Sequence, residues 1–598
     1  MATRVEHDFI GELEIDDSVY YGVQTFRALE NFKMTGRRFG DYPFFVKAFA
    51  QIKKAAALAN AELGVLAQDK CDYLCKACDR VIAGEFADQF VVDMIQGGAG
   101  TSTNMNMNEV LTNVALEMMG QKKGAYSDET LHPNDHTNRG QSTNDTYPSS
   151  IKVAAYAKLS DLLNEMKKLE AELSKKGAEW KDVIKMGRTE LEDAVPTTLG
   201  NTFNAFASYI KSDIAKITAA QEAMKVLNMG ATAIGTGINC HPDYKVAVEK
   251  HLSKITGVEF KPAQDLIAAT QDTADFVHVS GALKTAAVRL SKIANDLRLM
   301  NSGPRCGLGE IELPKMQPGS SIMPGKVNPV ICEVVGEACY EVMGNDVTIM
   351  LCSERGEFEL NAFEPGIAYA LFNSIIILEN AVRTLREKAI EHLKANPQTC
   401  LDHVLNSVGI VTSFNPVIGY EKSASIAKEA LQTGKKVGDI CLERGYLSKE
   451  EIDKLLDPKY MQHEKETFLG VTNARNYAKS ALEAAAQNAD AKNIAKLNNA
   501  ESSLLGSLKG LNIQMEAYPE LKANETMMQL NDELSSTENK IAFARQSYND
   551  SVMNYNVFKQ SFPCNIVAGF FTKYRDDMGM LEFNEDRKTL ENAPKVEF

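Results

Sequence analysis

Apolar residues recur at intervals of three and four positions along much of this 598-residue chain. The pattern predicts long amphipathic helices over residues 146–180, 200–228, 266–301 and 329–352. The interruptions between them are short and rich in glycine and proline, so neighbouring helices should run antiparallel in a bundle. Strand patterns are sparse. The sequence therefore predicts an all-α fold around a long central helical bundle.

Changes in the pattern divide the chain into four regions. In the third region, shorter helices are expected to break at Asn415-Pro416 and at Gly445. The fourth is rich in alanine, asparagine, lysine and glutamate, which predicts an appended antiparallel helical segment. The predicted regions are an N-terminal domain over 1–145, a helical-bundle domain over 146–395, a small domain over 396–461 and an extension over 462–598.

Composition narrows the classes of partner. The net charge of −15 argues against nucleic acid and anionic membranes as partners, and it means that an anionic substrate must be held by local donors. No apolar run approaches the roughly 18 residues of a membrane span, and the N-terminus lacks the apolar core of a secretory signal. Eleven scattered cysteines suit a reducing cytoplasm. Cys71, Cys75 and Cys78 could share a helix face, but we expect packing there and no metal.

Three polar segments differ from the helical background, and each leads into a predicted helix. They are Gly97–Asn104, Gln141–Asp145 and Gly319–Pro329. In the third, Asn328 is a candidate N-cap and Pro329 suits the first helical position.

A helix N-terminus offers free N–H donors and partial positive charge, and neighbouring hydroxyl groups add further donors. Three such ends brought together would form a cage for carboxylates. The alternative for each segment alone is that its Ser, Thr and Asn residues only cap a helix. Lys326 favours the binding interpretation for the third segment, because it places a positive charge in a loop shaped by glycine and proline.

The run GSSIMPGKVNP resembles the signature of the fumarase/aspartase superfamily. The similarity extends through GGAGTSTNMNMNEV, HPNDHTNRGQSTND, GRTELEDAVPTTLG and GATAIGTGIN, and it covers residues 3–462. Within the superfamily the sequence is most similar to the aspartate ammonia-lyases. The resemblance implies reversible deamination of L-aspartate to fumarate, no cofactor, and a homotetramer whose active sites are shared between subunits.

The resemblance also implies roles for individual residues. Ser320 matches the general base, which takes a proton from the carbon beside the substrate's β-carboxylate. Asn144 matches a residue that faces the amino group, and Met323 belongs to the same substrate-binding set. The matches to the β-carboxylate donors are Thr101, Ser142, Thr143 and Ser321, and those to the α-carboxylate contacts are Thr189, Lys326 and Asn328.

One position departs from the family pattern. After Gly187-Arg188-Thr189 the family usually has histidine, or glutamine in some aspartases, and here Glu190 follows. A carboxylate suits acceptance from a substrate ammonium group and does not suit the handling of water, which favours aspartate over malate. The alternative is that Glu190 only lies on a solvated face. Glu333 matches the partner of that histidine, and two adjacent carboxylates would repel until a cationic substrate binds.

Beyond residue 462 the segments HEKETFLGVTNARN, SFPCNIVAG and APKVEF resemble part of the LemA family, and we expect this part of the chain to lack that family's membrane anchor and first helix. Two other functions remain open for the lyase region: a class II fumarase-like hydratase, and a catalytically silent scaffold protein with the same fold.

Overall fold

The structure is a computed structural model that describes residues 2–457, residues 546–569 and a few single positions between them. It contains two compact units. The first comprises residues 1–181 and 199–399, and the second comprises residues 182–198 and 400–598. Residues 182–198 therefore belong to the second unit, although residues of the first unit lie before and after them in the sequence.

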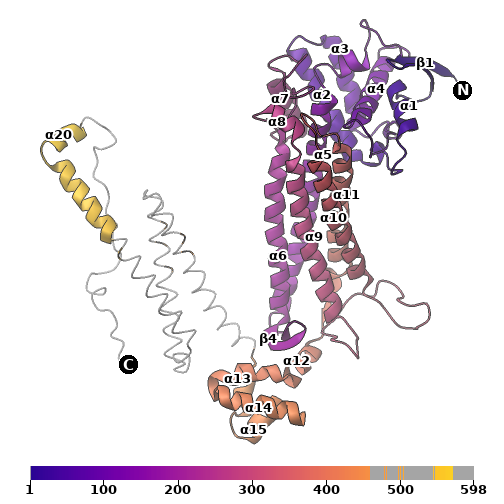
Figure 1. Ribbon diagram of the computed structural model, residues 1–598. Helices are drawn as coiled ribbons and strands as arrows, with labels where there is room; N and C mark the ends of the chain where they lie inside the picture. The colour runs from indigo at the N-terminus through magenta and orange to yellow at the C-terminus, as the bar shows by residue number, and fades with distance from the viewer. Residues whose placement is uncertain are drawn as a thin grey trace. The chain divides into compact units, whose positions relative to one another are not determined.

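Five long helices form the body of the first unit and lie side by side (Figure 1). The longest, α5, has 37 residues and is therefore about 55 Å long. It packs against α6 and α11, while α10 packs against α9 and α11. The bounds are α5 Thr143–Glu179, α6 Leu199–Gln221, α9 Ala274–Met300, α10 Val330–Glu354 and α11 Glu364–Lys388. The predicted all-α bundle is confirmed.

Shorter elements cluster around the N-terminal end of α5. A hairpin of β1 and β2 precedes α1, and α2 packs against α3, α5 and α7. Buried aromatic rings gather at α2, where the Phe45 ring lies 5.0 Å from Phe39 and 5.9 Å from Tyr147. The bounds are β1 Thr3–Asp8, β2 Gly11–Asp16, α1 Val23–Asn31, α2 Pro43–Glu62, α3 Gln68–Ile82, α4 Thr101–Met118, α7 Tyr244–Thr256 and α8 Leu266–Gln271. Two short pairs complete the unit: β5 Val226–Leu227 with β6 Lys261–Pro262, and β7 Ile311–Glu312 with β8 Lys394–Ala395.

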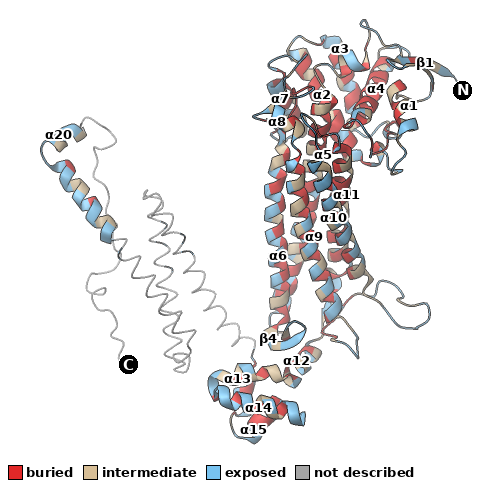
Figure 2. Ribbon diagram, viewed as in Figure 1, coloured by how far each residue is buried: buried red, intermediate tan, exposed pale blue. Residues whose placement is uncertain are grey.

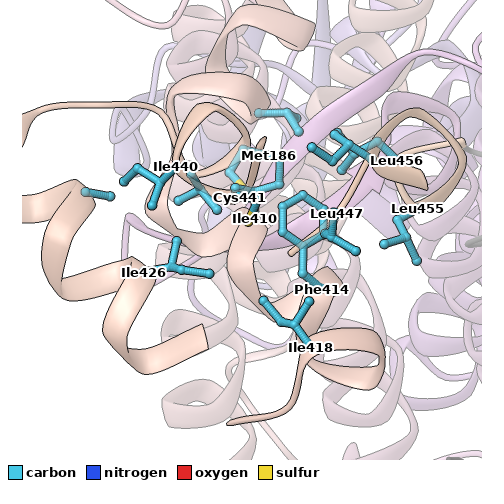
Figure 3. Packing of buried hydrophobic residues seen from close by; sticks show 14 of the residues in the cluster. Met186, Ile410, Phe414, Ile418, Ile426, Ile440, Cys441, Leu447, Leu455 and Leu456 are labelled. Atoms are coloured by element: carbon cyan, nitrogen blue, oxygen red, sulfur yellow. The ribbon is translucent and has the colours of Figure 1, made fainter. Parts of the chain in front are cut away.

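The second unit joins an antiparallel hairpin to a group of short helices. Its core contains Met186 from the hairpin and Phe414, Ile440 and Leu447 from the helical part, all 4% exposed or less (Figure 3). The hairpin is therefore anchored by burial of its own side chains. The bounds are β3 Ile184–Thr189, β4 Glu192–Thr198, α12 Pro397–Asn406, α13 Val411–Ile418, α14 Tyr420–Thr433, α15 Val437–Glu443 and α16 Lys449–Leu455.

Three local predictions were wrong. The expected break at Asn415-Pro416 lies inside α13, and the helix ends instead at Gly419, whose φ of +82° favours glycine. Asn328 does not cap α10: Pro329 is the N-cap, because the Asn328 amide donates back to the Gly319 carbonyl. The predicted helix over 266–301 is two helices, α8 and α9, with Asp272 and Thr273 between them.

Among the described residues, one helix, Glu364–His392, is long and apolar enough to cross a membrane. This helix contains α11. Two thirds of its most apolar stretch of 18 residues is buried inside the protein, where α11 packs against α5, α9 and α10. Figure 2 shows this burial along the inward faces of the bundle. The helix is thus covered by protein, as the core helix of a globular domain is.

Most of the LemA-like extension lies outside the described residues. Residues 546–560 are helical and are followed by α20, Cys564–Gly569. The predicted antiparallel arrangement of this extension stays a prediction.

Candidate active site

The first two polar segments meet where α4 and α5 begin. Gly98, Ala99 and Gly100 all have φ between +54° and +91°, and this turn leads directly into α4 at Thr101. A Cβ atom at Gly100 would lie 2.4 Å from the Tyr147 ring of α5, so only glycine permits this approach. The close packing brings the N-termini of the two helices together, as the anion-cage hypothesis requires.

Ser142 caps α5. Its Oγ accepts from the Asn144 backbone N–H at 3.2 Å, and the Asp145 carboxylate accepts from the Ser142 N–H at 3.0 Å. Asp145 also accepts from the backbone N–H groups of Gly230 and Thr232, at 3.2 and 3.0 Å. Burial raises the pKa of Asp145 to about 7 although these donors oppose the shift. One buried carboxylate therefore holds the start of α5 against the 230–232 loop.

A network of amide side chains links the two helix starts. Asn104 of α4 donates from Nδ2 to Thr143 Oγ1 at 3.3 Å and to Asn138 Oδ1 at 3.1 Å. Asn144 donates to the Ala233 carbonyl at 2.7 Å. Thr101 is exposed, and its hydroxyl donates to the Gly98 carbonyl at 2.8 Å. These bonds fix the donors at one end of the bundle.

Ser320 lies in a loop that closes on itself. The Gly319 N–H donates to the Lys326 carbonyl at 2.8 Å, and Asn328 Nδ2 donates to the Gly319 carbonyl at 2.9 Å. Inside the loop, Ser320 Oγ accepts from the N–H groups of Ile322 and Met323, at 3.2 and 2.9 Å. Two donors aimed at one hydroxyl oxygen stabilise negative charge on it, which is what a serine base requires.

The tip of this loop is exposed although it carries apolar side chains. Ile322 is 83% exposed and Met323 50%. Lys326 and Ser321 are also exposed. Glu333, one turn into α10, lies 3.9 Å from Arg298 of α9, so the loop is held beside the C-terminal end of α9.

The length of α9 separates this loop from the segments at the start of α5. At the N-terminal end of α9, Asp275 forms an ion pair with Lys152 of α5 at 2.6 Å. Next to it, the Thr273 hydroxyl forms a hydrogen bond with the Ser353 hydroxyl of α10 at 2.7 Å. The loop with Ser320 follows the other end of α9, and 27 residues of helix span about 40 Å. Within one chain Ser320 therefore cannot reach Thr143.

The third set of predicted residues lies on the hairpin of the second unit. Thr189 and Glu190 are exposed at its tip, where Thr189 pairs with Glu192 across a two-residue turn. Both turn residues have positive φ, +55° at Glu190 and +68° at Leu191. Turns of this kind favour Asn and Gly, and other residues there carry about 1–3 kcal/mol of strain each.

The structure thus brings together only part of the predicted set: Thr101, Ser142, Thr143 and Asn144 at one end of the bundle. A second group, containing Ser320, Ser321, Met323, Lys326, Asn328 and Glu333, lies at the other end. The sequence analysis assigned no individual role to the groups that support the first site, which are the buried Asn104 and Asp145 and the half-buried Asn138. Their signal was available, since each is a polar residue within four positions of a predicted binding residue. Cys71 and Cys75 have their sulfur atoms 3.8 Å apart in α3, and in the described parts of the chain no three metal-ligating side chains are grouped to hold an ion.

Comparison with known proteins identifies the family. Residues 11–344 match the family described as Lyase, and residues 410–463 match the one described as Fumarase C C-terminus. An aspartate ammonia-lyase of Helicobacter pylori is 56% identical over 77% of this chain and 97% of its own length. The chain belongs to the aspartate ammonia-lyase family. The resemblance predicted from the sequence is confirmed.

Solved structures agree with this family assignment. A fumarate lyase:delta crystallin of Brucella melitensis aligns with a TM-score of 0.75 and 45% identity over 77% of this chain and 99% of that one. A class II fumarase of Schistosoma mansoni aligns with a TM-score of 0.72 at 33% identity, over 76% of this chain and 98% of that one. Residues 456–598 match the LemA family, so this family member carries an appended LemA segment.

Proposed function

We propose that the protein deaminates L-aspartate to fumarate and ammonia. The observation that carries the proposal is the 56% identity to an aspartate ammonia-lyase over 97% of that protein. The match to the Lyase family over residues 11–344 includes all three polar segments. The class II fumarase is only 33% identical. Glu190 adds support from this chain itself, since a carboxylate accepts hydrogen bonds from an ammonium group.

In the proposed mechanism Ser320, as its alkoxide, takes a proton from the carbon beside the β-carboxylate. The electron pair moves into that carboxylate, which becomes an aci-carboxylate dianion held by Thr101, Ser142, Thr143 and Ser321. The pair then forms the carbon–carbon double bond, and ammonia leaves with the electrons of the carbon–nitrogen bond. Lys326, Asn328 and Thr189 bind the α-carboxylate, and Asn144 and Glu190 face the amino group.

This chemistry requires donors that act most strongly as charge builds on the β-carboxylate. A preorganised donor of this kind contributes on the order of a hundred- to a thousand-fold in rate. The fixed positions of Ser142 and Thr143 on a capped helix start satisfy that requirement. The Ser320 loop is anchored at its base and exposed at its tip, which suits closure over a substrate that excludes water.

The proposal extends to a homotetramer with shared active sites. The 40 Å length of α9 keeps Ser320 away from Thr143 of its own chain, so a complete site needs a second copy. An exposed apolar row on α10 offers a surface for that copy: Tyr340, Val347 and Leu351 are 62%, 50% and 53% exposed at a spacing of seven and four. This spacing is the one that packs helices against one another.

Location is proposed as cytoplasmic. All eleven cysteines are unpaired, two of them with sulfur atoms within contact distance, and this is expected where thiols are kept reduced.

The decisive experiment follows fumarate by its ultraviolet absorbance with purified protein and L-aspartate, L-malate or argininosuccinate as substrate. Fumarate should form from aspartate. The Ser320→Ala variant should lose turnover while keeping its helical content, and Ser374→Ala is the matched control because the Ser374 hydroxyl donates to the Ala370 carbonyl within its own helix, α11. Faster formation of fumarate from malate than from aspartate would show that the protein is a hydratase.

Shared sites are tested by mixing two inactive variants. In a random one-to-one mixture of Ser320→Ala and Thr143→Ala chains, about one quarter of the sites should combine an intact Ser320 with an intact Thr143 from another chain. Activity should therefore return after the variants are dissociated and reassembled together. Complete absence of activity in hybrids that do assemble would mean that each site is built within one chain.

A further inference from the structure

Lys53 is a buried cation in α2 that the proposed mechanism leaves unused. Its side chain is only 2% exposed. The Nζ atom donates to Asn138 Oδ1 at 3.0 Å and to Gln141 Oε1 at 2.9 Å, and both acceptors are uncharged amides. Among the described residues no carboxylate forms an ion pair with it. Burial of a charge without a paired countercharge costs several kcal/mol, so an anion that binds nearby would stabilise the protonated form of Lys53.

The direction of the pKa shift at Lys53 also indicates that negative charge is lacking around it. Burial lowers the pKa of Lys53 to about 7, and coulombic interactions with Asp145 and Cys78 oppose that shift only in part. These are the titratable groups that act on it from α5 and α3. Burial also raises the pKa of Asp145 to about 7. An anion that binds nearby therefore favours the protonated form of Lys53.

Hydrogen bonds connect this ammonium group to the β-carboxylate donors. Asn138 Oδ1 accepts from Lys53 and also from Asn104 Nδ2, and Asn104 Nδ2 in turn reaches Thr143 Oγ1. On the other branch, Lys53 holds Gln141, the residue directly before Ser142. Both branches thus lead to the segment Ser142–Asn144.

We propose that Lys53 is a positioning residue of the active site, whose ammonium group fixes Asn138 and Gln141 and supplies buried positive charge behind Thr143. This inference rests on the proposed function, because it assumes that the substrate's β-carboxylate binds at Thr143. In this role Lys53 contributes charge to the active site without touching the substrate. Its charge is partly lost from the free protein at neutral pH and is restored when a dicarboxylate binds.

Binding of an anion should take up protons from solution, because the anion raises the pKa of Lys53. Below a pH of about 6, Lys53 is already charged, so binding of an anion takes up almost no proton. At a pH of about 8 most free protein has neutral Lys53, and binding should take up nearly one proton per site from solution. Affinity should change about tenfold for each unit by which the bound anion raises the pKa of Lys53.

The test is isothermal titration calorimetry of the full-length protein with succinate, which has both carboxylates and no amino group to lose. Measurements in two buffers with different ionisation enthalpies give the number of protons taken up. The expected result for the wild-type protein is an uptake that rises from near zero at about pH 6 toward one at about pH 8. Succinate that binds without proton uptake across this range would overturn the inference, whether or not any variant folds.

A pair of variants assigns the proton. Lys53→Met should abolish the uptake and weaken succinate binding, whereas Lys54→Met should leave both unchanged because Lys54 pairs with Asp79 at 2.6 Å on the outer side of α2. An uptake that persists in Lys53→Met would assign the proton to Asp145 and contradict the role given to Lys53. Failure of the wild-type protein both to bind succinate and to form fumarate from aspartate would overturn the proposed function, and the inference with it.

Discussion

Replacement of Met186 by alanine tests whether the core of the second unit positions the hairpin that carries Thr189 and Glu190. Met186 is completely buried and packs with Phe414 and Ile410 in the core shown in Figure 3. Removal of a buried Met side chain to Ala costs about 2–5 kcal/mol, because the transfer energy is lost and a cavity remains. At 1.4 kcal/mol for each factor of ten, the open form of this unit should become on the order of 30- to 3,000-fold more populated.

Hydrogen-exchange mass spectrometry measures this directly. Exchange should accelerate in residues 184–198 and 400–456, and peptides from α5 and α10 should exchange as in the wild-type protein. Leu431→Ala is the matched control, because Leu431 belongs to the same unit and is 74% exposed. In the activity assay Met186→Ala should raise KM for aspartate. Unchanged exchange in the hairpin would refute the idea that this core holds it, and equal acceleration in α5 would show that the two units unfold together.

Three further predictions concern single parts of the chain. Lys326→Ala should weaken aspartate binding by about 1.5–3 kcal/mol, the range of a hydrogen bond to a charged group, seen as a higher KM with the helical content unchanged; an unaltered KM would remove Lys326 from the α-carboxylate contacts. Glu190→Gln should keep aspartase activity, since an amide oxygen also accepts from ammonium, and a steady-state assay that finds no fumarate formation would show that the charge itself is needed. A chain ending at Pro458 should remain active, because the proposed site residues all precede it, and loss of activity from a folded truncated protein would show that the LemA-like segment takes part in catalysis.

The long helices were predictable because each keeps one apolar face for more than twenty residues, as α5, α9 and α10 show. The ends of these helices were less predictable. Asn328 has the residue type of an N-cap, but its amide closes the Ser320 loop instead, and a local pattern cannot show that competition. The 184–198 hairpin was missed because its turn is Glu190-Leu191, which lacks the Asn-Gly signal of tight hairpins.

The candidate site was predicted as a set of residues, and the family resemblance implied that subunits share it. The places of these residues along the bundle were not predicted. The motifs themselves do not show which copy of the chain supplies each residue, because that depends on the separation of about 40 Å along α9. Lys53 could have been found. It follows Phe49 by four residues and precedes Asn60 by seven, so it lies on the buried face of α2, whereas the adjacent Lys54 does not.

The distance between Ser320 and Thr143 also affects how activity depends on protein concentration. If two copies must supply one site, a dilute solution of folded single chains has no turnover at all, and specific activity reports the fraction of chains that are assembled. Recovery after denaturation should then begin with a lag in which helical content has returned and fumarate formation has not. The length of that lag should shorten as protein concentration increases, because association is the step that creates the catalyst.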